Sequence, residues 1–264
     1  MIYQSGNWSR DLFLEGPRGN APGLVCVNKF GRAPSGVQTT NTDIWDRADA
    51  TPTQSTWTAP TQARIHDIAS TSGSDVFGGL GARTLKVFGL TDWDTKEVNE
   101  DIILNGSTNA ATINPYVIIH RMRVLTKGPD GVNLGTITAT AQTDSTVTAQ
   151  INVGEGQTQM AIYGIPSVQT GFMIHYYTSI NKAHGVVAAI NANLVVNPEP
   201  KAELTNFLIK NTQGIQSTGT GHFQHFFQPY FKIPGPAIVK VRGTASTADV
   251  EASAGFDIIL VENN

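Results

Sequence analysis

Most of the chain after residue 62 consists of short apolar runs separated by turn residues. Residues 135–140 and 145–153 alternate clearly, with threonines on one side and Ile137 and Ile151 on the other. Because successive side chains of a strand point to opposite faces, these runs predict strands with one buried face. Helical spacing never persists for three turns, so the pattern predicts little α-helix.

Turn signals connect these runs in an antiparallel order. The runs at residues 82–90 and 96–104 flank the turn sequence TDWD, and Asn105-Gly106 follows the second run. An Asn-Gly pair supplies the positive φ angles of a type I′ turn and is typical of hairpins. About a dozen such strands predict an all-β fold, an antiparallel β-sandwich with jelly-roll-like wiring.

The first 62 residues have a different pattern, rich in Gly, Pro, Thr, Asn and Gln and without a sustained period. We expect an extended N-terminal arm over residues 1–62, followed by a β-sandwich domain over 63–264 with a subdivision near 126–134. Isolated aromatic residues on such an arm have large apolar areas to bury against a neighbouring subunit or against their own domain. Both alternatives stay open for these residues: Trp8, Phe13, Phe30, Trp45 and Trp57.

The stretch HFQHFFQPYF, residues 222–231, concentrates aromatic residues within one strand's length. Strand alternation places His222 and His225 on opposite faces, so they cannot chelate one ion together. Aromatic side chains on both faces indicate a strand that packs on the core and also contacts another subunit. The predicted contact residues here are Phe223, Phe226, Phe227, Tyr230 and Phe231.

Composition narrows the possible partners. Charged residues make up 15% of the 264 residues, the formal net charge is −3, and no basic run is present. We therefore expect neither nucleic acid nor a membrane as partner, since both attract basic surfaces. The single cysteine, Cys26, excludes an intrachain disulfide and is consistent with folding in a reducing cytoplasm. We see no secretory signal, and no apolar run approaches the roughly 18 residues of a membrane span.

Candidate chemistry is sparse. The chain lacks the G-x-S-x-G, H-E-x-x-H and P-loop motifs, so we expect no enzyme, no catalytic residues and no cofactor. The four remaining histidines, His66, His120, His175 and His184, lie far apart and predict no metal site. TDWDTKEVNED begins like a calcium loop, but Lys96 stands where an oxygen ligand is needed. It is typical of a turn with solvated charges, and calcium on Asp92 and Asp94 stays an alternative.

Three stretches together resemble a known group of proteins: GARTLKVFGLTDWDTKEVNEDIILNG, GQTQMAIYGIPSVQTGFM and FKIPGPAIVKVRGTASTADVEASAGFDIILVE. They are similar to virion structural proteins of tailed bacteriophages, common among aquatic and marine phages, from about Trp45 to the C-terminus. The resemblance implies a structural, non-enzymatic role in the virion and carries no catalytic residue over to this chain.

With the expected arm and low charge, this resemblance favours a capsid decoration or cement protein. Such a protein would be synthesised in the host cytoplasm and lie on the capsid surface. Its expected partners are the major capsid protein and copies of itself, as a homotrimer by analogy with proteins at local three-fold positions.

Two other classes stay open. A tail fibre, adaptor or receptor-binding sandwich would grip glycan on exposed flat rings, for which Trp45, Trp57 and Trp93 are the candidates. The competing interpretation is that Trp93 packs under its turn and the other two hold the arm. The chain could also be the main shell protein itself.

Overall fold

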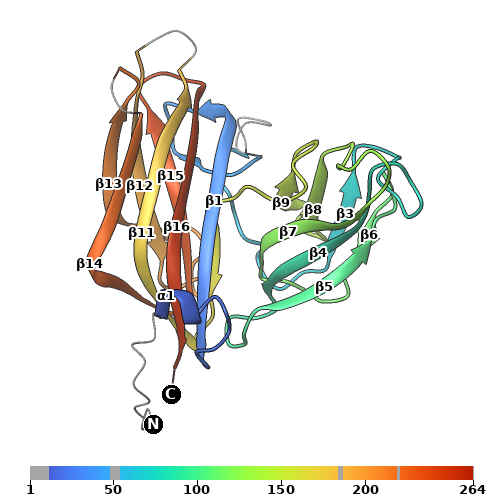
Figure 1. Ribbon diagram of the computed structural model, residues 1–264, viewed down its shortest axis with the longest axis horizontal. Coiled ribbons are helices and arrows are strands. Elements are labelled where there is room, and N and C mark those ends of the chain that lie inside the picture. The colour runs from blue at the N-terminus through green and yellow to red at the C-terminus, as the bar shows by residue number, and fades with distance from the viewer. Residues whose placement is uncertain (1–11, 48–53, 184–186, 219–220, 264) are drawn as a thin grey trace.

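The computed structural model describes residues 12–47, 54–183, 187–218 and 221–263. These residues form two lobes, built mostly of antiparallel strands with one short helix, α1 (Leu12–Glu15). The larger is a β-sandwich, called here the sandwich lobe. The smaller, called the insert lobe, is formed by the strands between β2 and β10 and lies beside the sandwich (Figure 1). The predicted all-β antiparallel sandwich is confirmed.

The sandwich lobe contains two sheets whose neighbouring strands are all antiparallel. In order across the first sheet, the strands are β1 (Leu24–Val37), β16 (Val250–Glu262), β11 (Gln169–Lys182) and β14 (His222–Pro234). Across the second they are β10 (Ile162–Ile165), β15 (Ala237–Ala245), β12 (Ala189–Asn197) and β13 (Leu208–Gln216), with β2 (Thr42–Asp43) also paired to β15. The sandwich therefore has one edge formed by β1 and β10 and an opposite edge formed by β14 and β13.

The insert lobe is a smaller pair of sheets. One sheet has the order β5 (Val98–Ile103), β4 (Ala82–Leu90) and β7 (Ile118–Lys127). The other has the order β6 (Ala110–Ala111), β3 (His66–Ser70), β8 (Ile137–Ala141) and β9 (Thr146–Ile151). Inward-facing residues such as Leu85, Met122 and Ile137 are completely buried between them.

The two lobes share apolar packing. Gly164 of β10 lies so close to the insert lobe that an added Cβ would be 2.9 Å from Ile118 and 3.3 Å from Leu90. A glycine at this position thus permits close approach of the sandwich edge to β4 and β7. The buried core cluster continues from one lobe into the other.

The predicted arm over residues 1–62 is wrong for its described part from residue 24 onward. Residues 24–37 form β1, which pairs with β16 from Leu24 opposite Val261 to Val37 opposite Val250. The composition of this segment, with its glycines, predicted an extended arm, but Gly31 has a packing reason. A Cβ there would lie 2.5 Å from Ala161 N and from Ile44 O. Of the two alternatives for the aromatic residues, the structure supports packing on their own domain for Trp45 and Trp57, which are 1% and 2% exposed.

The predicted domain boundaries also need correction. Residues 63–264 do not form one sandwich, because the strands from β3 to β9 build the separate insert lobe. Residues 126–134 span the end of β7 and the loop before β8, inside that lobe. The chain crosses between lobes near residues 58–65 and 159–161. The change of sequence pattern near residue 62 coincides with the first crossing, whereas no such change marks the second.

Candidate functional sites: an interlobe cleft and an exposed sheet edge

A cleft of about 630 Å³ lies where β1 of the sandwich lobe faces the insert lobe. Residues 25–30 of β1 line one side, and Tyr163 of β10 also contributes. The insert lobe supplies an aromatic ring and four ionisable side chains: Phe88, Lys96, Glu97, His120 and Arg121. Clefts between domains are common ligand sites, so the arrangement of these groups decides what the cleft can do.

Three side chains in the cleft contact one another closely. The distance between His120 Nε2 and Glu97 Oε2 is 2.5 Å, and the Tyr163 hydroxyl donates to the same carboxylate oxygen at 3.4 Å. The His120 and Tyr163 rings stack with their centroids 4.2 Å apart. Burial lowers the pKa of His120, so its neutral imidazole donates Nε2–H to Glu97. These contacts join β7 and β10 through Glu97.

Lys29 of β1 extends into the same site and is only 3% exposed. Its ammonium group donates to the backbone carbonyl of His120. Burial, with the nearby positive charge of Arg121, lowers the pKa of Lys29 to about 7, although Glu97 acts in the opposite direction. Arg121 in turn donates from Nη2 to the Asn28 carbonyl at 3.0 Å, on the free edge of β1.

A histidine–carboxylate pair beside a lysine of lowered pKa has the composition of an acid–base site. Here, however, the contacts of Lys29, Glu97 and His120 connect β1, the segment before β5, β7 and β10. They hold the insert lobe on the sandwich edge. Within the described residues, no group of three or more His, Cys, Asp or Glu side chains is placed to bind a metal ion.

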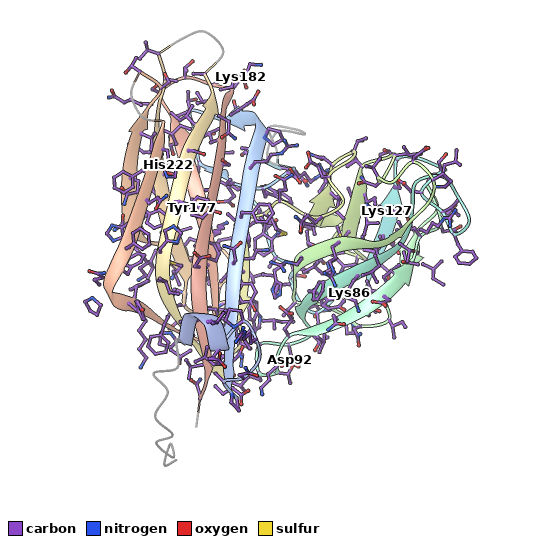
Figure 2. All side chains as sticks on the ribbon, viewed as in Figure 1. Lys86, Asp92, Lys127, Tyr177, Lys182 and His222 are labelled. Atoms are coloured by element: carbon purple, nitrogen blue, oxygen red, sulfur yellow. The ribbon has the colours of Figure 1, made fainter. Side chains whose placement is uncertain are left out.

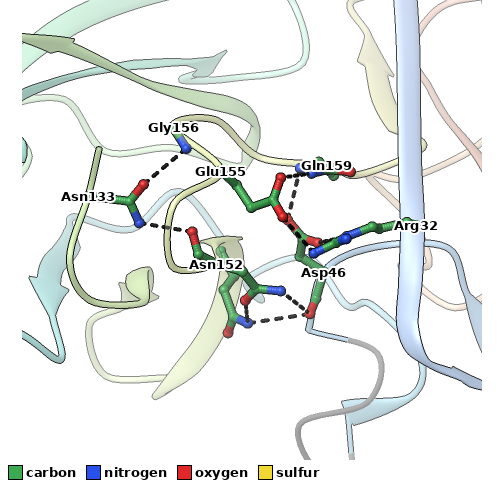
Figure 3. Close-up of polar contacts among 8 residues, drawn as sticks. Arg32, Asp46, Asn133, Asn152, Glu155, Gly156 and Gln159 are labelled. Atoms are coloured by element: carbon green, nitrogen blue, oxygen red, sulfur yellow. Dashed lines mark hydrogen bonds and ion pairs between the residues drawn. The ribbon is translucent and has the colours of Figure 1, made fainter. Parts of the chain in front are cut away.

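A second polar joint between the lobes centres on Asp46, which is 2% exposed (Figure 3). Its carboxylate accepts from Arg32 Nε at 3.3 Å and from the Gln159 backbone N–H at 3.2 Å. Arg32 also forms an ion pair with Glu155 at 2.7 Å. Burial raises the pKa of Asp46 to about 7, against the opposing effects of the Gln159 and Arg32 contacts. Sandwich and insert residues thus share one network.

The three tryptophans are not glycan platforms. Trp45, Trp57 and Trp93 are 1%, 2% and 7% exposed, so none presents an open ring face. Trp57 is fixed by Asp43, whose Oδ2 accepts its backbone N–H at 2.8 Å and the Lys240 ammonium at 2.6 Å. That part of the glycan hypothesis is wrong because all three side chains are buried in the core of the protein.

The TDWD segment is a turn tied to the sandwich. Asp92 accepts from the Asp94 backbone N–H at 2.7 Å and from Thr95 Oγ1 at 2.9 Å. Asp94 pairs with Lys201 at 2.6 Å. Both carboxylates therefore have protein partners that fit the predicted turn with charged side chains, and the contacts give the calcium alternative no support.

The opposite edge of the sandwich, formed by β13 and β14, has exposed apolar side chains where the first edge has buried polar ones. Figure 2 shows His222 of β14 at this edge and Tyr177 on the adjacent strand β11, far from Lys86 and Lys127 of the insert lobe. Five apolar or aromatic side chains are exposed on these two strands by 39% to 61%, and we call them the outer-edge patch: Leu208, Ile209, Phe223, Phe226 and Tyr230.

The side chains of β14 alternate as predicted. Phe226 stacks on His175 with ring centroids 4.7 Å apart and an interplanar angle of 15°. His225 and Phe227 instead lie against the buried Tyr176. One set of β14 side chains therefore contacts the core, while the other is on the outer surface of the sheet.

The remaining predicted contact residues divide into three groups. Trp8 lies outside the described residues, as does the side chain of Phe13 in α1. Phe30 is half-buried in the lining of the cleft. Phe227 and Phe231 are half-buried and lie 5.6 Å apart. Sequence reasoning missed Leu208 and Ile209, and it missed the cleft residues Lys29, Glu97 and His120.

Comparison with protein-family models gives no match, and comparison with curated proteins gives no significant relative. No helix among the described residues is long and apolar enough to cross a membrane.

Proposed function

We propose that this chain is a structural, non-catalytic protein of a phage virion, most specifically a capsid decoration or cement protein. In this role it binds the major capsid protein and copies of itself on the capsid surface. The observation that carries the proposal is the outer-edge patch on β13 and β14. The sequence resemblance to virion structural proteins supports it independently.

The physical argument concerns an unpaired strand edge that carries exposed apolar side chains. In the described chain, β13 and β14 each pair with a neighbour on one side only, which leaves backbone N–H and C=O groups free on the other. Lys210 and Lys232 shield this edge in part, since charged side chains discourage the addition of another strand. The apolar side chains on the same strands are not shielded. Here Phe226 is 57% exposed and Ile209 is 61% exposed. Such a combination favours a protein whose edge is covered in an assembly.

We infer further that the sandwich lobe is a jelly roll. Numbered in chain order, its eight main strands follow the order first, eighth, third and sixth in one sheet. The order is second, seventh, fourth and fifth in the other. This distribution supports two intertwined Greek keys, an arrangement that recurs in viral capsid and lectin domains.

The copy number of the chain in purified virions tests the proposal. Quantitative mass spectrometry against the major capsid protein should give a ratio typical of a component repeated over the whole shell. A few copies per particle would instead place the chain at the tail or portal. If the chain is itself the most abundant protein of the virion, it is the main shell protein.

A glycan-binding module of a fibre or adaptor is the second candidate, and one observation favours it. The rings of Tyr177 and Phe226 both stack on His175, whose Nδ1 contacts Asp257 at 2.8 Å. Aromatic rings beside polar groups suit sugar recognition. A glycan array with the intact chain and with Phe226→Ala tests this candidate. Binding that the substitution abolishes would favour it over shell decoration.

A further inference from the structure

A second exposed apolar surface lies on the insert lobe, along β5. Phe77, Ile103 and Ile113 are 73%, 62% and 81% exposed, and we call them the insert-edge patch. The Phe77 backbone N–H donates to the Leu104 carbonyl at 3.2 Å, which places Phe77 just beyond the end of β5. The Ile113 backbone N–H donates to Glu100 Oε2 at 2.8 Å, beside the middle of β5.

The strand below this patch is itself an edge strand. Among the described residues β5 pairs only with β4, so its other side is an unpaired edge of the three-stranded sheet. Each copy therefore presents two unpaired edges with exposed apolar side chains. In Figure 1, β13 and β14 lie at one end of the molecule's longest axis, and the insert lobe forms the other end. The two patches of one chain cannot cover each other.

The charges of the two edges are complementary. Residues 208–234, from β13 to β14, contain Lys210 and Lys232 and no Asp or Glu. β5 contains Glu100 and Asp101 and no Lys or Arg, although Lys86 of β4 pairs with Asp101 at 2.5 Å. Residues 63–158 as a whole carry seven Lys and Arg against ten Asp and Glu. Two outer edges placed together would oppose like charges, whereas an outer edge placed on an insert edge would not.

We propose that copies of this chain associate head to tail, with the outer-edge patch of one copy on the insert-edge patch of the next. Such a contact joins two different surfaces, so it closes into a ring if the rotation between copies permits. It covers both exposed patches of every copy, which a two-fold contact between outer edges would not do. The proposal rests on the proposed function only in requiring that the outer edge is covered by another copy.

Single-cysteine crosslinking of the full chain tests the contact. Cys26→Ser removes the native thiol, and Phe226→Cys or Ile103→Cys then introduces one thiol into either patch. Both positions are more than half exposed, so the substitutions leave the core intact. Mass photometry first checks that Cys26→Ser associates like the natural chain. The variants are then oxidised singly and as a mixture and compared on a non-reducing gel.

We expect strong dimer bands in the mixture and weak bands from either variant alone. A chain carrying both new cysteines should give crosslinked species up to one closed size. Lys127→Cys, exposed elsewhere on the insert lobe, is the matched control and should crosslink weakly with Phe226→Cys. A strong band from Phe226→Cys alone would overturn the proposal in favour of a two-fold contact. A natural chain that stays monomeric at high concentration would also overturn it.

The test of the head-to-tail contact and the test of the proposed function can fail independently of each other. Mass spectrometry of virions measures whether the chain belongs to the shell, whatever contact its copies make. A shell protein that crosslinks through two outer edges would retain the proposed function and lose the head-to-tail contact. A head-to-tail oligomer absent from virions would do the opposite.

Discussion

The two edges of the sandwich lobe differ in what covers them. At the β1 and β10 edge, the insert lobe buries polar groups against one another, including Lys29 at 3% exposure and His120 at 1%. At the β13 and β14 edge, apolar groups such as Phe226 and Ile209 are more than half exposed. Buried polar groups are usually hydrogen-bonded, and here the Lys29 ammonium donates to the His120 carbonyl while His120 Nε2 contacts Glu97. The first edge was thus fitted to a cover within the chain, and the second has the composition of an edge covered by another chain.

The largest expected difference in stability is between substitutions of two tyrosines, one at each edge of the sandwich. Tyr163 is 4% exposed and stacks on His120, whereas Tyr230 is 44% exposed on β14. Tyr163→Ala should lower the free energy of unfolding by about 3–5 kcal/mol, as for other large buried aromatic residues. Tyr230→Ala should lower it by about 1 kcal/mol or less, since this residue is 44% exposed and loses much less buried area than Tyr163. Urea unfolding followed by circular dichroism measures both. Equal losses would show that the two edges do not differ in this way.

The next effect concerns the polar contacts of the covered edge. Glu97→Ala leaves the buried His120 Nε2–H without its acceptor, and this should cost about 1–3 kcal/mol of unfolding free energy. Glu262→Ala is the matched control, since it breaks the solvent-exposed pair with Lys96 and should cost about 1 kcal/mol or less. A Glu97→Ala chain as stable as the control would mean that the His120 contact does not hold the lobes together.

The sequence patterns predicted the strands better than they predicted which segments pack on those strands. The runs predicted at 82–90 and 145–153 match β4 and β9 closely, because alternation records which face of a strand is buried. Alternation does not record what buries that face. Residues 24–37 were predicted as part of an extended arm because the packing of Gly31 against Ala161 and Ile44 involves segments distant in sequence. The cleft was missed for the same reason, since Lys29 and His120 lie 91 residues apart and show no motif.

The pH dependence of stability tests the burial of Lys29. Its pKa is about 7 in the folded chain and 10.5 as the ordinary value, so between these values the unfolded chain binds more protons. Raising the pH through this window therefore stabilises the fold, by at most about 1.4 kcal/mol per pH unit for one group. Lys29→Met should remove this gain between pH 8 and 9. Lys232→Met, on the exposed edge, should leave it unchanged.

Two other buried groups also make stability depend on pH. The contribution of Lys29 is therefore measured as the difference between the pH profiles of the natural chain and Lys29→Met. Lys240, whose pKa burial lowers to about 8, adds a gain of the same sign above pH 8. The pKa of Asp46 is raised to about 7, so its contribution changes only below that pH. Between about pH 4 and 7 the folded chain binds more protons at Asp46, and stability therefore falls as the pH rises. Both contributions are common to the natural chain and to Lys29→Met, so they cancel. An unchanged pH profile in Lys29→Met would mean that Lys29 keeps its proton in the folded chain.

Substitutions in the outer-edge patch should have the smallest effect on the stability of the monomer and the largest effect on its association. Phe226→Ser removes a ring that is 57% exposed and loses its stacking on His175, so the monomer should lose about 1 kcal/mol or less. Because association stabilises the folded chain by mass action, unfolding must be measured at a dilution where both proteins are monomeric. Mass photometry at higher concentration should then show fewer oligomers for the variant. Since Phe256 on the same sheet is fully buried, Phe256→Ser should instead destabilise the monomer strongly. A Phe226→Ser monomer that unfolds as readily as Phe256→Ser would mean that the outer edge belongs to the core, and its exposure would no longer argue for a partner.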